Sequence, residues 1–396
     1  MSRNVPKLRF KGFEDEWKDE KLGDFLMKST DVTTEHTDIP VLTSSRRGLF
    51  LQSEYFNREV AAKDTTGYNI LKRGYFTYRH MSDDSTFHFN INRFIDIGLV
   101  SPEYPVFTTK QDLNSYFLEQ HLNSSLMFSK FCKMQKKGGT RTRLYFKVLE
   151  NYKLKLPTLQ EQEKIANFLS KVDSIIEKQE KKVEYWSSYK KGMMQKIFKQ
   201  EIRFKDENGM DYPEWKINKI ENIATIEMGF TPSTKNDEAW NGNIDWLSIA
   251  GMNSKYIYSG NKKISSEILG KRKLVPIDTL IMSFKLTIGR LAIVKKDIVT
   301  NEAICQFYWK SKDISNEYMY AYLSVINIQS FGCRAAKGIT LNTESLNSIV
   351  VKLPCLEEQT KIANFLSNID NIIDKESKKL EELKQWKKGL LQQMFV

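Results

Sequence analysis

A long internal repeat divides the chain into two halves. Residues 156–198 and 353–395 align without a gap, and about 24 of the 43 aligned positions are identical. Both copies begin with Leu-Pro-x-Leu-x-Glu-Gln and continue as Lys-Ile-Ala-Asn-Phe-Leu-Ser. Because each copy of a repeated segment forms the same structural unit, the two halves must share one plan.

A weaker repeat opens each half. Leu8-Arg9-Phe10-Lys11 precedes Trp17, and Ile202-Arg203-Phe204-Lys205 precedes Trp215. Between an arm and the next long repeat lies a block with little identity to its counterpart. We therefore predict six segments: an N-terminal arm at 1–17, a first block at 18–155, a first helix at 156–199, a repeated arm at 200–215, a second block at 216–352 and a second helix at 353–396.

The two blocks share an order of predicted elements despite their different sequences. Apolar extended segments predict strands, an amphipathic helix follows, and a basic loop with glycine and threonine leads to a last strand before Leu-Pro. The clearest segments are strands at 279–284 and 288–294, helices at 112–123 and 316–326, and loops at 136–143 and 334–340. We expect an α+β protein in which two long helices separate two mixed α/β domains.

The repeated helices carry apolar residues at alternating spacings of four and three. This spacing, held over five heptads, is typical of helices that form a coiled coil, and the natural mate is the other copy. We expect antiparallel pairing, which relates the halves by a pseudo-two-fold axis; the alternative is that each stripe faces only a local core. The seam positions are Ile165, Leu169, Val172, Ile176, Val183 and Trp186 in the first helix, and Ile362, Leu366, Ile369, Ile373, Leu380 and Leu383 in the second.

Three local features of the helices give further expectations. Thr158 and Glu161 are spaced as a capping box. Gly192 and Gly389 could end or bend the helices early. If the halves share one plan, the chain end near Phe395 should lie beside the first arm, as the end of the first helix lies beside the second.

The charge of the chain suits a polyanionic partner. It carries a net charge of +12, with 25 basic and 19 acidic residues in 1–155 and 20 and 17 in 201–352. Lysine can contact phosphates and arginine can contact guanine O6 and N7, although basic clusters are often only solvated surface. The candidate DNA-contacting residues are Arg46, Arg47, Lys136, Lys137, Thr140, Arg141 and Arg143 in the first block, and Lys255, Tyr256, Lys271, Arg272, Lys273, Arg334 and Lys337 in the second.

Most catalytic and metal-binding motifs are missing. The four cysteines form no CxxC pair, and there is no phosphate-binding loop, GxGxxG or HExxH. We predict no metal site, no membrane span and a cytoplasmic location. Two alternatives stay open: a magnesium-dependent nuclease using Glu214 and Lys216 of a Glu-x-Lys pair, and a coiled-coil assembly protein whose charge serves only solubility.

The duplicated Leu-Pro-x-Leu-x-Glu-Gln helices resemble the conserved segments of type I restriction-modification specificity subunits, as do both arms and the Gly-Phe-Thr-Pro-Ser opening at 229–233. The resemblance implies a non-catalytic subunit whose blocks each read one half of a bipartite, asymmetric sequence in double-stranded DNA. It also implies an antiparallel spacer, two modification methyltransferase subunits and further restriction (translocase) subunits as partners. S-adenosylmethionine, ATP and Mg²⁺ would belong to those partners. The first block lacks the Gly-x-Thr-Pro-Ser opening.

Overall fold

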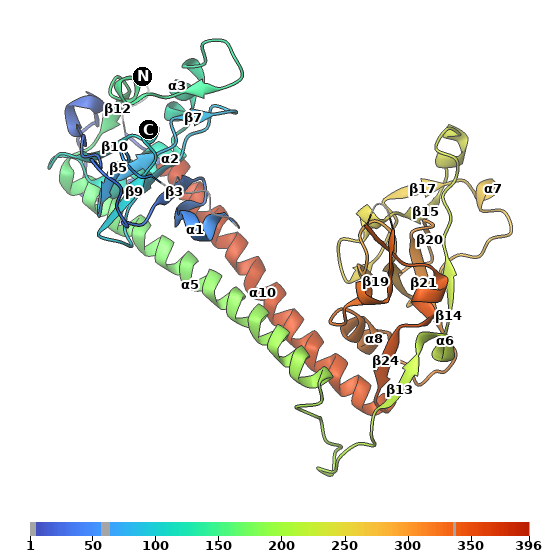
Figure 1. The fold of residues 1–396 in the computed structure, drawn as a ribbon. Helices are drawn as coiled ribbons and strands as arrows, with labels where there is room; N and C mark the ends of the chain where they lie inside the picture. Colours follow the sequence, from blue (N-terminus) through green and yellow to red (C-terminus); the bar gives the residue numbers. More distant parts are fainter. Residues whose placement is uncertain (1–4, 57–63, 336–337, 396) are drawn as a thin grey trace. The chain divides into compact units, whose positions relative to one another are not determined.

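Two compact units make up the chain. The computed structural model describes residues 5–56, 64–335 and 338–395. One unit comprises Met1–Lys181 with Lys378–Val396, and the other comprises Lys182–Ser377 (Figure 1). Each unit therefore holds one variable block together with part of each long helix. The chain divides within the helices, and not at the ends of the segments predicted from the sequence, because each helix end packs into a block.

The first unit contains a four-stranded antiparallel sheet in the order β2-β10-β6-β8, covered by two helices, α2 and α3. The predicted helix at 112–123 is confirmed as α2. The strands are β1 Lys18–Lys21, β2 Leu26–Lys28, β3 Leu42–Ser45, β4 Gly48–Leu51, β5 Asn69–Lys72, β6 Phe76–Tyr78, β7 Met81–Ser82, β8 Phe89–Ile91, β9 Ile97–Val100, β10 Val106–Thr109, β11 Thr142–Arg143 and β12 Lys153–Leu156; the helices are α1 Gln52–Tyr55, α2 Ser115–Ser124, α3 Leu126–Met134 and α4 Phe146–Leu149.

The second unit contains a five-stranded sheet, β14-β21-β18-β19-β16, and a three-stranded sheet, β17-β15-β20. The predicted strands at 279–284 and 288–294 are confirmed as β18 and β19, and the helix at 316–326 as α8. The strands are β13 Lys216–Lys219, β14 Ala224–Met228, β15 Ile244–Leu247, β16 Tyr256–Ile257, β17 Lys262–Ile264, β18 Leu280–Ser283, β19 Leu291–Val294, β20 Val299–Thr300, β21 Ile304–Trp309, β22 Cys333–Ala335, β23 Gly338–Thr340 and β24 Val350–Leu353; the helices are α6 Ile220–Ile223, α7 Ser266–Leu269, α8 Asn316–Leu323 and α9 Thr343–Asn347.

Each block is closed by its own first and last strands. In the first block β1 pairs antiparallel with β12, so that Lys18 lies opposite Leu156. In the second, β13 pairs antiparallel with β24, and Lys216 lies opposite Leu353. The Leu-Pro step that starts each long helix therefore leaves directly from the strand that closes the block. This connection fixes the direction in which each helix leaves its block.

The long helices, α5 (Leu159–Phe198) and α10 (Leu356–Met394), run side by side (Figure 1). In each unit, ion pairs join residues later in α5 to residues earlier in α10, so the expected antiparallel pairing is confirmed. Gly192 and Gly389 lie inside the helices and end neither of them. No helix in the described part of the chain is apolar and long enough to span a bilayer. The ion pairs between the helices are Asp173–Lys387 and Glu180–Lys384 in the first unit, and Lys182–Glu376 and Lys190–Asp370 in the second.

The seam residues are most buried where a helix also meets a block. Leu169 of α5 and Leu366 of α10 are buried and belong to the cores of the first and second units. Val183 and Leu380, nearer the helix midpoints, are only half-buried. The ends of the stripes thus face both a partner helix and a local core, so the two interpretations of the sequence pattern hold together.

The last residues of the chain lie beside the first arm, as expected. The Leu8 backbone N–H donates to the Gln393 carbonyl at 2.9 Å, and the Phe395 ring lies 5.2 Å from that of Phe117 in α2. In the second unit Phe198, the counterpart of Phe395, packs on Tyr318 of α8 at 6.0 Å. Both units therefore use the same aromatic contact between a helix end and a block helix.

Candidate nucleic-acid interface

The glutamate of each Leu-Pro-x-Leu-x-Glu-Gln segment binds an arginine of the repeated arm. The Arg9 Nε and Nη2 atoms donate to the two carboxylate oxygens of buried Glu161, both at 2.8 Å. Arg203 contacts buried Glu358 in the same way, at 3.2 and 3.0 Å. The hydrogen bond to the glutamate raises the pKa of both arginines. A buried carboxylate requires such a partner, so the two repeated motifs form one structural contact.

The predicted capping box at the start of α5 is half right. Thr158 Oγ1 accepts the Glu161 backbone N–H at 3.4 Å, as a capping residue should. The Glu161 carboxylate does not complete the box, because it is turned to Arg9. A remote ion pair has replaced the local hydrogen bond.

The glutamine of the same motif joins each long helix to its block. Its side-chain amide makes three backbone hydrogen bonds in each copy, which satisfies polar groups that are otherwise buried without water. Two of them position the segment just before the block helix. Gln162 bonds Pro157 O (3.0 Å), Asp112 O (3.2 Å) and Asn114 N (2.9 Å); Gln359 bonds Pro354 O (2.9 Å), Asp313 O (2.9 Å) and Ser315 N (2.9 Å).

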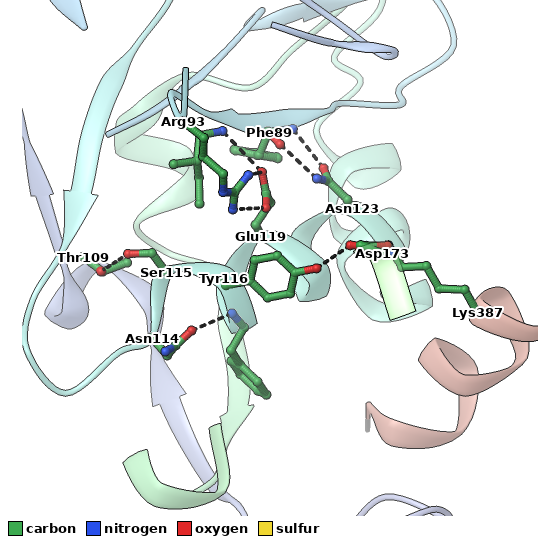
Figure 2. Close-up of polar contacts among 12 residues, drawn as sticks. Phe89, Arg93, Thr109, Asn114, Ser115, Tyr116, Glu119, Asn123, Asp173 and Lys387 are labelled. Atoms are coloured by element: carbon green, nitrogen blue, oxygen red, sulfur yellow. Dashed lines mark hydrogen bonds and ion pairs between the residues drawn. The ribbon is translucent and has the colours of Figure 1, made fainter. Parts of the chain in front are cut away.

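A polar network holds α2 against both long helices in the first unit (Figure 2). The Tyr116 hydroxyl donates to Asp173 of α5, whose other oxygen receives Lys387 of α10 at 2.6 Å. On the sheet side of α2, Glu119 takes a bidentate contact from Arg93, at 2.6 and 3.0 Å. These contacts join α2 to both long helices on one side and to the segment that follows β8 on the other.

Lys255 and Tyr256, predicted to contact DNA, make internal contacts in the second unit. Lys255 Nζ lies 2.7 Å from a Glu317 carboxylate oxygen and 5.2 Å from the centre of the Tyr320 ring. The Tyr256 hydroxyl donates to Glu317 at 3.0 Å, and Lys255 also reaches Ser367 of α10 at 3.4 Å. These residues tie the second block to its helices. Their contact with DNA stays a prediction, and we leave them out of the surface proposed below.

The structure brings three predicted arginines of the first block together. Arg46 and Arg47 form the two-residue tip of the β3–β4 hairpin, and Arg46 Nη2 donates to Asp84 at 2.5 Å. Arg141, from the loop before β11, donates through Nε to Asp83 at 2.9 Å. Because Asp83 and Asp84 are adjacent, residues from two distant segments meet at one turn.

We call this surface the arginine face, made of Arg46, Arg47, Arg79, Arg141 and Arg143. A cavity of about 550 Å³ opens in it, lined in part by the first three of these arginines. Lys136, Lys137 and Thr140 are exposed on the adjoining loop. Among the acidic, basic and histidine side chains that line this cavity, sequence reasoning missed four; the acidic Asp83-Asp84 turn was the available signal. The missed residues are Arg79, Asp83, Asp84 and His88.

Two basic residues of the second block lie over half-buried aromatic rings. Lys271, Arg272 and Lys273 follow α7 and are exposed. The Arg272 guanidinium lies 4.3 Å from the centre of the Phe230 ring, a cation–π distance. Lys262, which the sequence did not single out, lies 4.9 Å from the Trp240 ring. This surface differs from the arginine face in using aromatic rings to hold its cations.

The Gly-Phe-Thr-Pro-Ser motif shapes the loop that carries Phe230. Trp246 Nε1 donates to the Phe230 carbonyl at 2.8 Å, and Trp240 Nε1 to the Ser233 carbonyl at 3.1 Å. A Cβ at Gly229 would lie 1.8 Å from the Thr300 carbonyl oxygen, so only glycine fits there. The motif and its tryptophans thus form a scaffold beneath the basic residues.

Two predicted contacts lie at the edge of what the structure describes. Arg334 belongs to β22, and its side chain lies outside the described part. Lys337 lies outside the described residues altogether. Both stay predictions.

The Glu-x-Lys pair proposed for a nuclease belongs to the arm. Glu214 is exposed and pairs with Arg203 at 3.2 Å, while Lys216 begins β13 in the strand pair that closes the block. Within residues 5–56, 64–335 and 338–395, no three His, Cys, Asp or Glu residues are grouped so that they could hold a metal ion. These contacts give the pair a structural role and do not support the nuclease hypothesis.

Comparison with protein families places the chain. Residues 14–185 and 212–385 each match the type I restriction modification DNA specificity domain. The two matches together span most of the chain, and each contains one variable block and part of one long helix. The chain belongs to this family.

Similar proteins carry the same domain. The chain is 27% identical over 280 residues to the type I restriction enzyme MjaVIII specificity subunit of Methanocaldococcus jannaschii, covering 66% of this chain and 65% of that subunit. It is 29% identical over 301 residues to the putative MjaX specificity subunit of the same organism, covering 71% and 67%.

Solved structures share the fold. A type I restriction-modification S subunit from M. genitalium is similar with a TM-score of 0.56 at 13% identity, covering 99% of both chains. A second structure, from a study of assembly and conformational transition in a type I restriction-modification system, gives a TM-score of 0.58 at 14% identity, covering 96% of this chain and 98% of that one. At these identities the likeness concerns the fold alone.

Proposed function

We propose that this chain is the DNA-specificity subunit of a type I restriction-modification complex. Each variable block reads one half of a bipartite, asymmetric double-stranded DNA target, and the helices set the gap between the halves. One observation carries the proposal: two DNA specificity domains with unlike blocks are built on one repeated helix in a single chain. A palindromic target would require two identical readers, and this chain has two different ones.

The distribution of charge supports a DNA partner. Most of the net charge of +12 lies in the two blocks, and both blocks expose basic side chains from loops. Loops on a rigid scaffold can differ between proteins without loss of the fold, as sequence readers must. The charge of an assembly protein would need no such arrangement.

We further propose that the chain is non-catalytic and works in the cytoplasm, where the DNA is. S-adenosylmethionine, ATP and Mg²⁺ would then be bound by two methyltransferase subunits and by restriction (translocase) subunits. Exposed apolar side chains on the long helices offer them docking points. These are Ile175 and Trp386 in the first unit, and Tyr185 and Tyr189 in the second.

Exchange of one block tests the proposal. Residues 18–155 are replaced by the corresponding block of a relative, and methylated sites are mapped by single-molecule sequencing in a host with the methyltransferase. We expect one half of the methylated sequence to change, with the other half and the gap kept. A change in both halves, or in neither, would contradict the modular assignment.

Binding measurements separate a sequence reader from a merely basic assembly protein. A reader that neutralises several phosphates loses affinity steeply as salt rises, yet keeps its preference for one sequence over another. The control is a duplex of equal length with a scrambled site. Equal affinity for both duplexes at every salt concentration would favour the assembly protein.

A further inference from the structure

Arg141 of the arginine face is held on one side of its guanidinium group. Its Nε donates to Asp83 Oδ1 at 2.9 Å, and the side chain is 50% exposed. Its terminal Nη1 and Nη2 atoms make no hydrogen bond to any residue that the structure describes. The two Nη atoms therefore form a free fork of donors, which the contact with Asp83, itself 74% exposed, orients without enclosing it.

The turn that carries Asp83 is itself held firmly. Asp84 accepts hydrogen bonds from Ser82 Oγ at 2.8 Å and from the Thr86 backbone N–H at 3.0 Å, in addition to Arg46. Its pKa lies below the usual value, chiefly because of Arg46 and then Ser82. Ser85 adopts φ = +62°, a conformation that non-glycine residues rarely adopt and that often marks functional turns.

The same turn is joined to the segment that carries Arg141. β7 pairs antiparallel with β11, so that Ser82 lies opposite Thr142. The buried hydroxyl groups of Ser85 and Thr142 lie 2.7 Å apart. The positions of Asp83 and Arg141 are therefore set by the backbone pairing of β7 with β11 and by one buried hydrogen bond between their neighbours.

The other arginine–carboxylate pairs that the structure describes in this unit lack the free fork. Arg73 makes the same Nε contact with Asp96 at 2.9 Å, but its Nη1 donates to the Arg93 carbonyl at 2.6 Å. Arg9 directs Nε and Nη2 at Glu161 and also donates to a backbone carbonyl. Arg73 and Asp96 thus provide a matched pair whose fork is partly occupied.

A free fork of two donors matches guanine. In the major groove guanine presents two acceptors, O6 and N7, on one edge, whereas adenine presents one acceptor and one donor. A fork fixed in advance loses less side-chain entropy on binding than a mobile one.

Resting on the function proposed above, we infer that Arg141 reads a guanine in the half-site assigned to the first block, and that Asp83 is its positioning residue. A lysine would supply the charge without the fork. Loss of Asp83 would leave the fork in place but mobile, and would also remove a negative charge from a surface that meets DNA.

Two variants test the inference in the complex with methyltransferase: Arg141→Lys and Asp83→Ala, with Arg73→Lys as control. Methylated sites are mapped first. We expect a guanine in the half-site that follows residues 18–155 on block exchange. With Arg141→Lys, methylation should become tolerant of other bases at that one position, while the second half-site stays unchanged. Arg73→Lys should leave both half-sites unchanged.

Affinities for duplexes with guanine or adenine at that position complete the test. Arg141→Lys should lower the guanine preference by about 5- to 150-fold, the range for one bidentate contact. Asp83→Ala, which removes the acceptor, should lower the same preference while affinity for scrambled DNA is kept or raised, which a merely structural role would not produce.

Two results would overturn the inference. One is a first half-site without guanine, and the other is a guanine preference that survives Arg141→Lys. If no half-site follows the first block at all, the proposed function fails together with the inference, and the block-exchange step distinguishes that case.

Discussion

At the scale of residues, the buried tryptophans of the two repeated arms differ in the hydrogen bonding of their indole N–H groups. Trp215 Nε1 donates to Glu358 at 2.9 Å, alongside Arg203. Trp17, its counterpart in the first arm, is 2% exposed, and its Nε1 finds no partner among the described residues. The glutamate position therefore receives three donor atoms in one copy and two in the other.

This difference predicts unequal costs for the same substitution. Trp215→Phe removes a hydrogen bond to a buried carboxylate, worth about 1.5–3 kcal/mol, in addition to apolar contact. Trp17→Phe removes an N–H without a partner, so only the loss of contact should register. We expect urea unfolding, followed by far-ultraviolet circular dichroism, to show a larger loss of stability for Trp215→Phe. Equal losses would mean that Trp17 has a partner in solution.

His121 gives the first unit a pH dependence. It is fully buried in α2, with Nε2 3.0 Å from the Tyr152 hydroxyl and the Phe395 ring beside it. Burial lowers its pKa from 6.5 to about 4. His121 is thus protonated near pH 6.5 in the unfolded chain but only near pH 4 in the folded chain. The free energy of unfolding therefore falls as the pH drops from 6.5 to 4.

We expect the His121 contribution to stability to be on the order of 3 kcal/mol above pH 6.5 and to be lost by pH 4. Because carboxylates also titrate in this range, the comparison is with His121→Gln, which cannot be protonated. The free energy of unfolding should depend less steeply on pH in the variant. Parallel profiles for the two proteins would contradict the assignment.

At the scale of elements, the seam residues of the long helices are unequally buried and should contribute unequally to stability. Leu169 is fully buried between α10 and the block, whereas Val183 is half-buried on the helix pair alone. The heptad pattern treats the two positions alike. Only Leu169 also packs against a block, and this contact makes it part of the hydrophobic core.

The substitutions Leu169→Ala and Val183→Ala should therefore differ. A cavity at Leu169 is expected to cost about 3 kcal/mol or more, and Val183→Ala less than about 1.5 kcal/mol. Both are measured by chemical unfolding, with helix content as the control for local unwinding. A cost at Val183 equal to that at Leu169 would show that the helix pair, and not the block, dominates the seam.

At the scale of the whole molecule, the duplication makes each unit a composite. Either unit contains the start of one long helix and the end of the other, so neither half of the sequence supplies a whole unit. The Leu8–Gln393 hydrogen bond places the end of α10 beside the first arm. The end of α5 is followed directly by the second arm, so the two helix ends have equivalent surroundings. The junction between the chain ends and the junction near residue 200 are thus structurally similar positions.

A circular permutant follows from this arrangement. Joining residue 396 to residue 1 and opening the chain near residue 200 should give a protein that assembles with methyltransferase and directs the same methylated sequence. Gln200, at φ = +61°, already marks the turn where α5 ends. Two outcomes for a folded permutant would contradict the equivalence of the two positions. One is that it does not bind methyltransferase, and the other is that it binds methyltransferase but directs methylation of another sequence.

The sequence by itself determined the duplication, the two long helices, their antiparallel partner and the family. Periodicity and repetition are written along the chain, so they can be recognised without coordinates. Only the tertiary structure decided what each charged side chain does. Arg141 and Lys255 are equally basic in the sequence, yet packing leaves the fork of one free and encloses the other beside Glu317. Ion pairs of this kind join residues far apart in the chain, and no local pattern specifies them.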